Sequence, residues 1–228
     1  MSSSAHPSLT KSYAAFLFDM DGTLLNSIPV VERIWGEWAT RHGLEPEVFL
    51  KTVHGIRAVD TIRALALPGV DPEQEAADLL VAEMADFTGI IAIPGAVAFL
   101  NSLPPERWAI VTSAPRELAD RRLEAAGIPL PRVMIAGEDV KAGKPSPECY
   151  RMGAEQLGFD AADCLVFEDA VAGILAGEAA GADVVVITAT HAHRIESPHL
   201  STASYEPFAV TSDADGRLVL DARAAVTV

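Results

Sequence analysis

The sequence predicts an α/β protein with a parallel, doubly wound sheet and a helical insertion behind its first strand. Short apolar runs alternate with helical patterns over most of the chain, which is typical of parallel sheets covered by helices. One long segment, residues 27–92, contains helical patterns with no strand pattern between them. We therefore expect a core formed by residues 13–26 and 93–228, a helical cap at 27–92, and a disordered tail at 1–12.

Composition limits the classes of function. Half of the 228 residues are hydrophobic, so a sizeable core can be buried, yet no apolar run is long enough to span a membrane. The formal net charge of −15 argues against non-specific nucleic-acid binding but not against a small anionic substrate. Cys149 and Cys164 have no metal-like spacing and suggest no disulfide framework. We expect a cytoplasmic protein, a monomer or weak dimer, with no nucleic-acid or membrane partner.

The first strand carries the strongest chemical signal. The apolar run Ala14–Phe18 is too short for a buried helix and is typical of a buried strand. It ends in Asp19 and Asp21, one residue apart, and Gly22 supplies a turn. Ligands bind at the carboxyl ends of strands in open α/β sheets, so these carboxylates lie where a site is expected.

The remaining elements follow in order. Helices in the insertion are expected at Ile28–His42, where Ile28, Val31, Trp35 and Trp38 share one face, at Ala58–Leu67 and at Glu73–Phe87. Beyond it we expect helices at Ala96–Leu103, Pro115–Ala126, Pro147–Leu157 and Ala170–Ala180, and strands at Trp108–Thr112, Val133–Ala136, Leu165–Phe167 and Val184–Thr188. Edge strands are predicted near Pro207–Val210 and Leu218–Leu220, and the polar run from His191 to His199 is interpreted as a solvated loop rather than a metal site.

Two carboxylates at this spacing can divide the work of phosphoryl transfer. Asp19 can attack phosphorus, and Asp21 can protonate the leaving oxygen and later deprotonate a water. Because both groups are acidic, a phosphate is tolerated only beside a cation, and Mg²⁺ suits a site of one or two carboxylates. Asp-x-Asp-Gly alone is equally compatible with an acidic turn.

Three more groups fall at the ends of other predicted strands. Thr112 and Ser113 can hold a phosphoryl oxygen at a helix start, or can simply cap the helix. Lys144 precedes Pro145, Ser146 and Pro147, where Ser146 is expected to cap the next helix; the lysine either balances charge or is an ordinary surface residue. Glu168 and Asp169 can complete a Mg²⁺ site, or Asp169 can be an N-cap. Together the four groups favour phosphotransfer chemistry.

The motifs DMDGT, VTS, GKPSPE and FEDAVAGI resemble the haloacid dehalogenase superfamily in its phosphatase branch. The resemblance covers nearly the whole chain and implies a Rossmann-like core with an inserted helical cap. It also implies that Asp19 is the nucleophile, Asp21 the acid/base, Thr112 a phosphoryl ligand and Lys144 a charge-balancing group. Mg²⁺ would be held by Asp19, the Asp21 carbonyl and Asp169, with Glu168 as an outer or shared ligand.

The cap segment His54–Gly55–Ile56–Arg57 is similar to that of yeast-type glycerol-3-phosphatases and 2-deoxyglucose-6-phosphatases. Ala114–Pro115 departs from the Gly–Thr of that group, beside the phosphate. We expect a Mg²⁺-dependent phosphatase of a small phosphorylated polyol or sugar, acting through a phosphoaspartate. Ser113, His54 and Arg57 are the expected substrate contacts, although Arg57 can instead pair with a cap carboxylate such as Asp60. A sugar phosphomutase and a phospho-accepting signalling module remain alternatives.

Overall fold

The computed structural model describes residues 11–191 and 197–222 of the chain. Its main sheet has six strands in the order β6-β5-β2-β7-β8-β9, and every neighbouring pair is parallel. The strands are β2 (Ala15–Phe18), β5 (Trp108–Val111), β6 (Met134–Ile135), β7 (Cys164–Glu168), β8 (Asp183–Ile187) and β9 (Leu200–Thr202). The predicted parallel, doubly wound sheet is confirmed.

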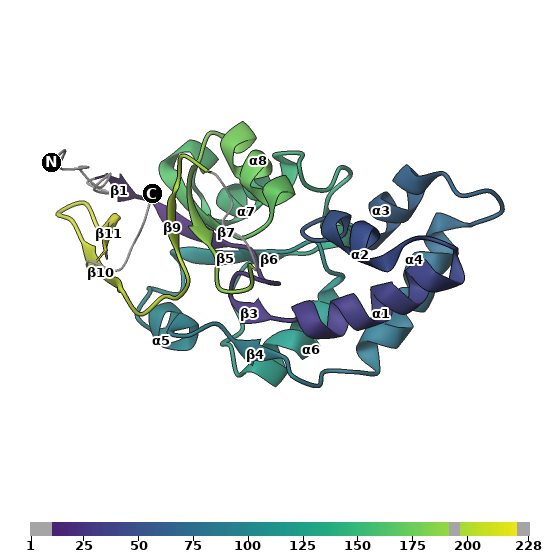
Figure 1. Ribbon diagram of the computed structural model, residues 1–228. Coiled ribbons are helices and arrows are strands. Elements are labelled where there is room, and N and C mark those ends of the chain that lie inside the picture. The colour runs from purple at the N-terminus through teal and green to yellow at the C-terminus, as the bar shows by residue number, and fades with distance from the viewer. Residues whose placement is uncertain (1–10, 192–196, 223–228) are drawn as a thin grey trace, which may run out of the picture.

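Helices cover both faces of this sheet, with α7 and α8 on one face and α5 and α6 on the other (Figure 1). Their bounds are α5 (Ala96–Asn101), α6 (Arg116–Ala126), α7 (Glu148–Leu157) and α8 (Val171–Ala180). The alternation of β2 explains the two layers, since Phe16 and Phe18 enter one buried cluster while Ala15 and Leu17 enter the other.

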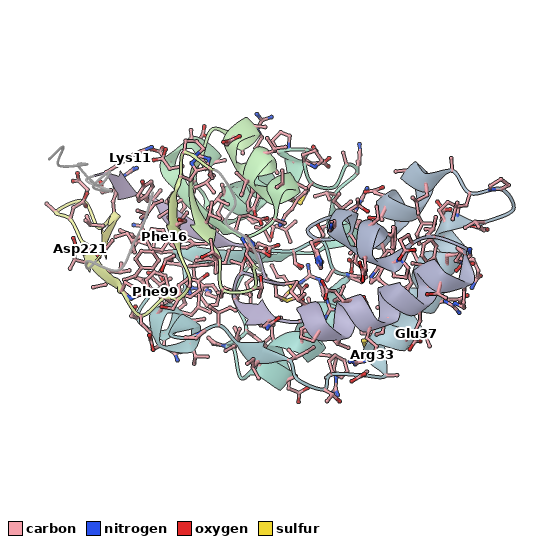
Figure 2. The ribbon with its side chains drawn as sticks, viewed as in Figure 1. Lys11, Phe16, Arg33, Glu37, Phe99 and Asp221 are labelled. Atoms are coloured by element: carbon pink, nitrogen blue, oxygen red, sulfur yellow. The ribbon has the colours of Figure 1, made fainter. Side chains whose placement is uncertain are left out.

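Aromatic rings pack against the strand that leads into the site. Phe18 stacks on Phe167 of β7 with ring centroids 4.7 Å apart, and Phe16 lies parallel to Phe99 of α5 at 6.2 Å. Figure 2 shows Phe16 and Phe99 within the body of the core. Such close-packed, fully buried rings fix the ends of β2 and β7 relative to each other.

The strand order reverses between β2 and β7. From β2 the chain proceeds outward to β5 and β6, then returns to the other side of β2 for β7, β8 and β9. Loops at the carboxyl ends of these two strands therefore diverge to opposite sides and leave a crevice between them. Asp19 and Asp169 follow directly after these two strands.

The inserted segment packs around a hydrophobic cluster of its own, formed by Trp35, Trp38, Phe49, Ile62 and Leu79 with smaller neighbours. Its elements are α1 (Ile28–Arg41), α2 (Pro46–Phe49), a 3₁₀ turn η1 (Leu50–Thr52), α3 (Ala58–Leu65) and α4 (Pro72–Met84). Figure 1 shows these helices gathered at the end of the molecule away from β10 and β11. The chain enters and leaves through β3 (Leu25–Asn26) and β4 (Ile91–Ala92), an antiparallel pair.

Two features differ from expectation. Ser12, placed in the disordered tail, begins strand β1 (Ser12–Tyr13), which pairs with β11. The predicted edge strands exist as β10 (Phe208–Ser212) and β11 (Leu218–Ala222), but they form a separate antiparallel sheet with β1. Leu218 and Leu220 are buried in the core cluster, so this small sheet covers the hydrophobic surface near α5. The main sheet has edge strands β6 and β9, and β9 is not among the strands predicted from the sequence.

Shorter elements complete the fold. Two further 3₁₀ turns, η2 (Gly137–Asp139) and η3 (Ala161–Asp163), lie in loops of the core. Residues 192–196 of the predicted polar loop lie outside the described residues, and His199 at its end pairs with Glu178 at 2.7 Å. Among the residues that the structure describes, no helix is long and apolar enough to cross a membrane.

Candidate active site

The carboxyl ends of β2, β5 and β7 bring Asp19, Thr112 and Asp169 to one edge of the sheet, as the sequence predicts. The backbone N–H of Asp19 donates to the carbonyl of Phe167 at 2.9 Å, which continues the β2–β7 pairing as far as Asp19. Gly22 follows with φ +90°, and a Cβ there would lie 2.0 Å from an Asp169 carboxylate oxygen. The turn after β2 is therefore built to let a second carboxylate approach.

Lys144 is buried, which excludes the alternative of an ordinary surface lysine. Its ammonium donates to Asp19 Oδ1 at 2.6 Å, to Glu168 Oε1 at 2.7 Å and to the Val111 carbonyl at 3.1 Å. Burial lowers the pKa of Lys144, but the charges of Asp19 and Glu168 outweigh this effect and hold the pKa above its ordinary value. The lysine is thus a fixed positive charge beside Asp19.

The loop that carries Lys144 is tied to the start of α7. Glu148 accepts hydrogen bonds from the backbone N–H groups of Lys141 and Ala142, both at 3.0 Å. Ser146 differs slightly from expectation, because Pro147 occupies the N-cap position and the Ser146 hydroxyl accepts from the N–H of Glu148 at 3.3 Å. Either arrangement holds the loop just ahead of a helix.

Glu168 uses both carboxylate oxygens within the protein. Oε1 accepts from Lys144 and from the Tyr150 hydroxyl at 2.9 Å, and Oε2 accepts from the N–H groups of Asp169 at 2.8 Å and Ala170 at 3.0 Å. A carboxylate offers about four lone-pair sites, so these donors occupy all of them. The absence of a side chain at Gly173 leaves space for the Glu168 carboxylate, since a Cβ there would lie 1.5 Å from Glu168 Oε1. Glu168 is therefore arranged to position Lys144 more than to bind a ligand.

Asp19, Glu168 and Asp169 form a buried cluster whose ligand oxygens lie within 4.8 Å of one another. Burial raises the pKa of Asp19 well above its ordinary range, and the charge of Glu168 adds to the effect against the opposing Lys144. Burial likewise raises the pKa of Asp169. Lys144 contacts two of these three carboxylates, Asp19 and Glu168, so a divalent cation would relieve the remaining repulsion. An all-oxygen donor set of this kind fits a hard cation such as Mg²⁺.

Asp21 has contacts that differ from those of Asp19. Its carboxylate accepts from the Ser27 hydroxyl, and from Arg122 Nη1 of α6 at 3.0 Å. Asp21 and Asp19 both line a cavity of about 90 Å³ between the core and the inserted helices. The two carboxylates thus share one cavity while keeping separate partners, as a division of roles requires.

Thr112 and Ser113 also line this cavity. The Thr112 hydroxyl accepts from the N–H of Ala114 at 3.1 Å, and the Ser113 hydroxyl donates to the carbonyl of Gly55 at 2.9 Å. The α6 N-cap is Pro115, so neither hydroxyl has the capping role that the sequence left open. Ser113 instead joins the core to the cap loop.

The two predicted cap contacts lie in different places. His54 lines the cavity, with Nε2 3.6 Å from a Glu32 carboxylate oxygen. Arg57 donates to Asp60 at 2.6 Å and to the backbone carbonyls of Gly137, Val140 and Lys141. The alternative in which Arg57 pairs with Asp60 is the one seen, and its guanidinium links the cap to a core loop rather than facing the cavity.

Sequence reasoning missed the Arg122–Glu83 pair. Arg122 on α6 lies 3.5 Å from Glu83 on α4, and both side chains line the cavity together with Trp35. A signal was present, because Arg122 follows Leu118 by one helical turn and precedes Leu123 on the buried face of α6. A charged residue within an apolar stripe needs partners, and those of Arg122 are Asp21 of the core and Glu83 of the inserted segment.

Comparisons with known proteins agree with these motifs. The family model of haloacid dehalogenase-like hydrolases matches residues 13–181. The chain is 41% identical to hexitol phosphatase A of Escherichia coli over 211 residues, which cover 90% of this chain and 97% of that protein. It is 37% identical to glycerol-1-phosphate phosphohydrolase 2 of Saccharomyces cerevisiae, with 77% of this chain and 75% of that protein covered.

Among solved structures, a hydrolase from Pseudomonas syringae superposes with a TM-score of 0.69 at 27% sequence identity. The superposition covers 77% of this chain and 84% of that one. Since the family model spans well over half of the sequence, and relatives above 30% identity are covered over most of their length, the resemblance inferred from the four motifs is confirmed. The chain belongs to the haloacid dehalogenase-like hydrolases.

Proposed function

We propose that this protein is a Mg²⁺-dependent phosphatase that hydrolyses a small phosphorylated polyol or sugar through a phosphoaspartate on Asp19. The observation that carries the proposal is the contact set of Asp19. A buried lysine holds one of its oxygens at 2.6 Å, and a second acidic residue, Asp21, lines the same cavity. This arrangement provides a nucleophile and an acid/base in one water-restricted space.

In the first half of the reaction, Asp19 forms a bond to phosphorus as the bond to the leaving oxygen breaks, and Asp21 gives that oxygen a proton. In the second half, Asp21 takes a proton from water, which attacks phosphorus and releases Asp19. Lys144 keeps a positive charge beside the aspartate throughout, because its own pKa is held high. Thr112, at the end of β5, is placed to hydrogen-bond a phosphoryl oxygen.

Asp19, the Asp21 carbonyl and Asp169 would hold Mg²⁺, which supplies positive charge that offsets the phosphate dianion. The Thr23 hydroxyl donates to Asp169 Oδ1 at 3.2 Å and so orients this carboxylate. Glu168 was expected as an outer or shared ligand, and its four hydrogen bonds favour the outer role.

The substrate class rests on the relatives and on the cavity. Relatives named for hexitol and glycerol-1-phosphate are 41% and 37% identical to this chain over most of their length. A cavity of about 90 Å³ with His54, Ser27, Glu83 and Arg122 in its wall suits a small hydroxylated leaving group.

The decisive experiment measures inorganic phosphate released from a panel of polyol and sugar phosphates, with Mg²⁺ and without any bisphosphate primer. We expect steady multiple turnover on at least one polyol phosphate. A requirement for a sugar bisphosphate would indicate a phosphomutase instead, and a phosphorylated protein that persists for seconds without turnover would indicate a signalling module.

Asp19→Asn is the matched variant for this assay. The amide is nearly the same size but cannot attack phosphorus, so turnover should be abolished while circular dichroism and the melting temperature stay near those of the unmodified protein. Phosphate release at near-normal rates by a folded Asp19→Asn protein would reject the phosphoaspartate route.

A further inference from the structure

Glu83 and Arg122 face the active-site cavity from two separate parts of the chain. Arg122 belongs to α6 of the core, and Glu83 to α4 of the inserted segment. The Arg122 side chain is only 5% exposed and that of Glu83 13%, so both charged groups are largely removed from water. Charges are rarely buried without a structural or functional reason.

Some hydrogen-bond donors of this pair have no partner within the described residues of the protein. Arg122 Nη1 donates to Asp21 at 3.0 Å, but Nε and Nη2 are buried without a hydrogen-bond partner among the described residues. Nη2 lies 3.5 Å from Glu83 Oε2, within ion-pair range but without hydrogen-bond geometry. A buried donor without a hydrogen-bond partner is costly, and the residue that carries it, Arg122, is one of those that line the cavity.

A hydroxyl group matches this pair chemically. It accepts a hydrogen bond from the guanidinium and donates one to the carboxylate at the same time, whereas Arg122 can only donate and an ionised Glu83 can only accept. A phosphate does not fit, since Glu83 would repel it. Burial raises the pKa of Glu83 while Arg122 opposes the shift, which is consistent with a pair held in a dry environment.

We propose that Glu83 and Arg122 form a subsite that binds a hydroxyl of the leaving polyol or sugar, away from the phosphate. This inference rests on the proposed function and deepens it, because it assigns recognition of the hydroxylated leaving group to two named side chains. Nearby Trp35, Val31 and Leu118 give the same cavity an apolar surface for the carbon chain. Asp21 shares Arg122 with this subsite, so a bound hydroxyl lies next to the group that protonates the leaving oxygen.

The test uses two substrates that differ only in hydroxyl groups, glycerol 1-phosphate and n-propyl phosphate, with saturating Mg²⁺. Glu83→Gln keeps the size of the side chain but removes the charge. We expect kcat/KM for glycerol 1-phosphate to fall by about tenfold to a hundredfold, the range for a lost hydrogen bond to a charged group. For n-propyl phosphate kcat/KM should change by less than about threefold, because that ester has no hydroxyl to bind.

Glu75→Gln is the matched control. Glu75 is on the same helix and is also partly buried, but it accepts from Trp38 at 2.8 Å and lies outside the set of residues that line the cavity. It should leave the ratio of the two kcat/KM values unchanged. Equal losses on both esters in Glu83→Gln, or no loss on either, would overturn the subsite.

The unmodified protein provides a measurement that does not depend on any variant folding. It should prefer glycerol 1-phosphate to n-propyl phosphate, and equal kcat/KM values would overturn the subsite while leaving the phosphatase proposal intact. Absence of phosphate release from every ester tested would instead overturn the proposed function, and the subsite with it.

Discussion

The site depends on carboxylates that hold different partners although they are close in sequence. Asp19 is bound by Lys144, whereas Asp21 is bound by Ser27 and Arg122. A nucleophile has to be ionised and held for attack, and an acid/base has to exchange its proton. Separate contacts would let two residues of the same type perform the two tasks proposed for them.

Asp21→Asn tests this division at the residue scale. The asparagine keeps the contacts to Ser27 and Arg122 within reach but cannot transfer a proton, so kcat should fall by about 10² or more. The measurement is steady-state phosphate release from the best substrate. An unchanged kcat would show that Asp21 only forms the turn after β2.

At the scale of elements, the loop between η2 and α7 positions Lys144, and Glu148 is its anchor. Two backbone hydrogen bonds, from Lys141 and Ala142, lower the pKa of Glu148 below its ordinary value of 4.5. Because the pKa is lower in the folded state than in the unfolded one, the stabilising contribution is present above the unfolded pKa. It is lost as the pH falls through the folded pKa.

Glu148→Gln should therefore lower the free energy of unfolding at pH 7 and lose this difference below about pH 4, the region where an ordinary Glu takes up its proton. Urea unfolding of both proteins at several pH values gives the comparison. Glu155→Gln, at an exposed position of the same helix, is the control. A difference that stays constant with pH would show that the two hydrogen bonds do not depend on the charge of Glu148.

The cap loop contains two residues with separate expected effects. Arg57 holds three carbonyls of a core loop, so Arg57→Ala should lower kcat/KM for a polyol phosphate and for p-nitrophenyl phosphate by similar factors. His54 lines the cavity, so His54→Ala should affect the polyol phosphate more.

Arg63→Ala is the control for this comparison, because Arg63 also pairs with Asp60, at 3.2 Å, but is exposed on the cap. It should leave both substrates nearly unaffected. If Arg57→Ala lowers kcat/KM for the polyol phosphate alone, Arg57 is a substrate contact, as the sequence suggested. If His54→Ala lowers kcat/KM for both substrates equally, His54 is a structural contact.

At the scale of the whole molecule, Mg²⁺ should stabilise the fold. Three buried carboxylates lie close together, and Lys144 contacts two of them, Asp19 and Glu168. A ligand that binds only the folded state adds about 2.7 kcal/mol at a concentration of 100 Kd. For a chain of this size that corresponds to a melting temperature higher by about 5–10 °C.

Differential scanning fluorimetry in Mg²⁺ and in EDTA, at matched ionic strength, measures this shift without reference to activity. Asp169→Asn should reduce it, because one carboxylate ligand is lost. A melting temperature independent of Mg²⁺ at every concentration would contradict the metal site.

Sequence alone was enough for the alternating strands and helices, and for Asp19, Thr112, Lys144 and Asp169 as one site. Asp19, Thr112 and Asp169 follow short apolar runs, and parallel strands necessarily end at a common edge, so local pattern implies spatial proximity. Lys144 instead lies in the loop between η2 and α7, beyond the end of β6. The longer inserted helices α1, α3 and α4 were also predicted from their apolar faces, whereas the four-residue α2 was not.

Tertiary structure alone decided the rest. The packing of α4 against α6 brings Glu83 to Arg122. The contact between the cap and the core loop lets Arg57 join the two. The pairing of β1 with β11 places the C-terminal strands in a sheet separate from the main one. In each case the partners lie far apart in the chain, and the sequence around one partner does not predict which residue is the other. Their meeting is set by how whole hydrophobic faces pack, which a single stretch of sequence does not encode.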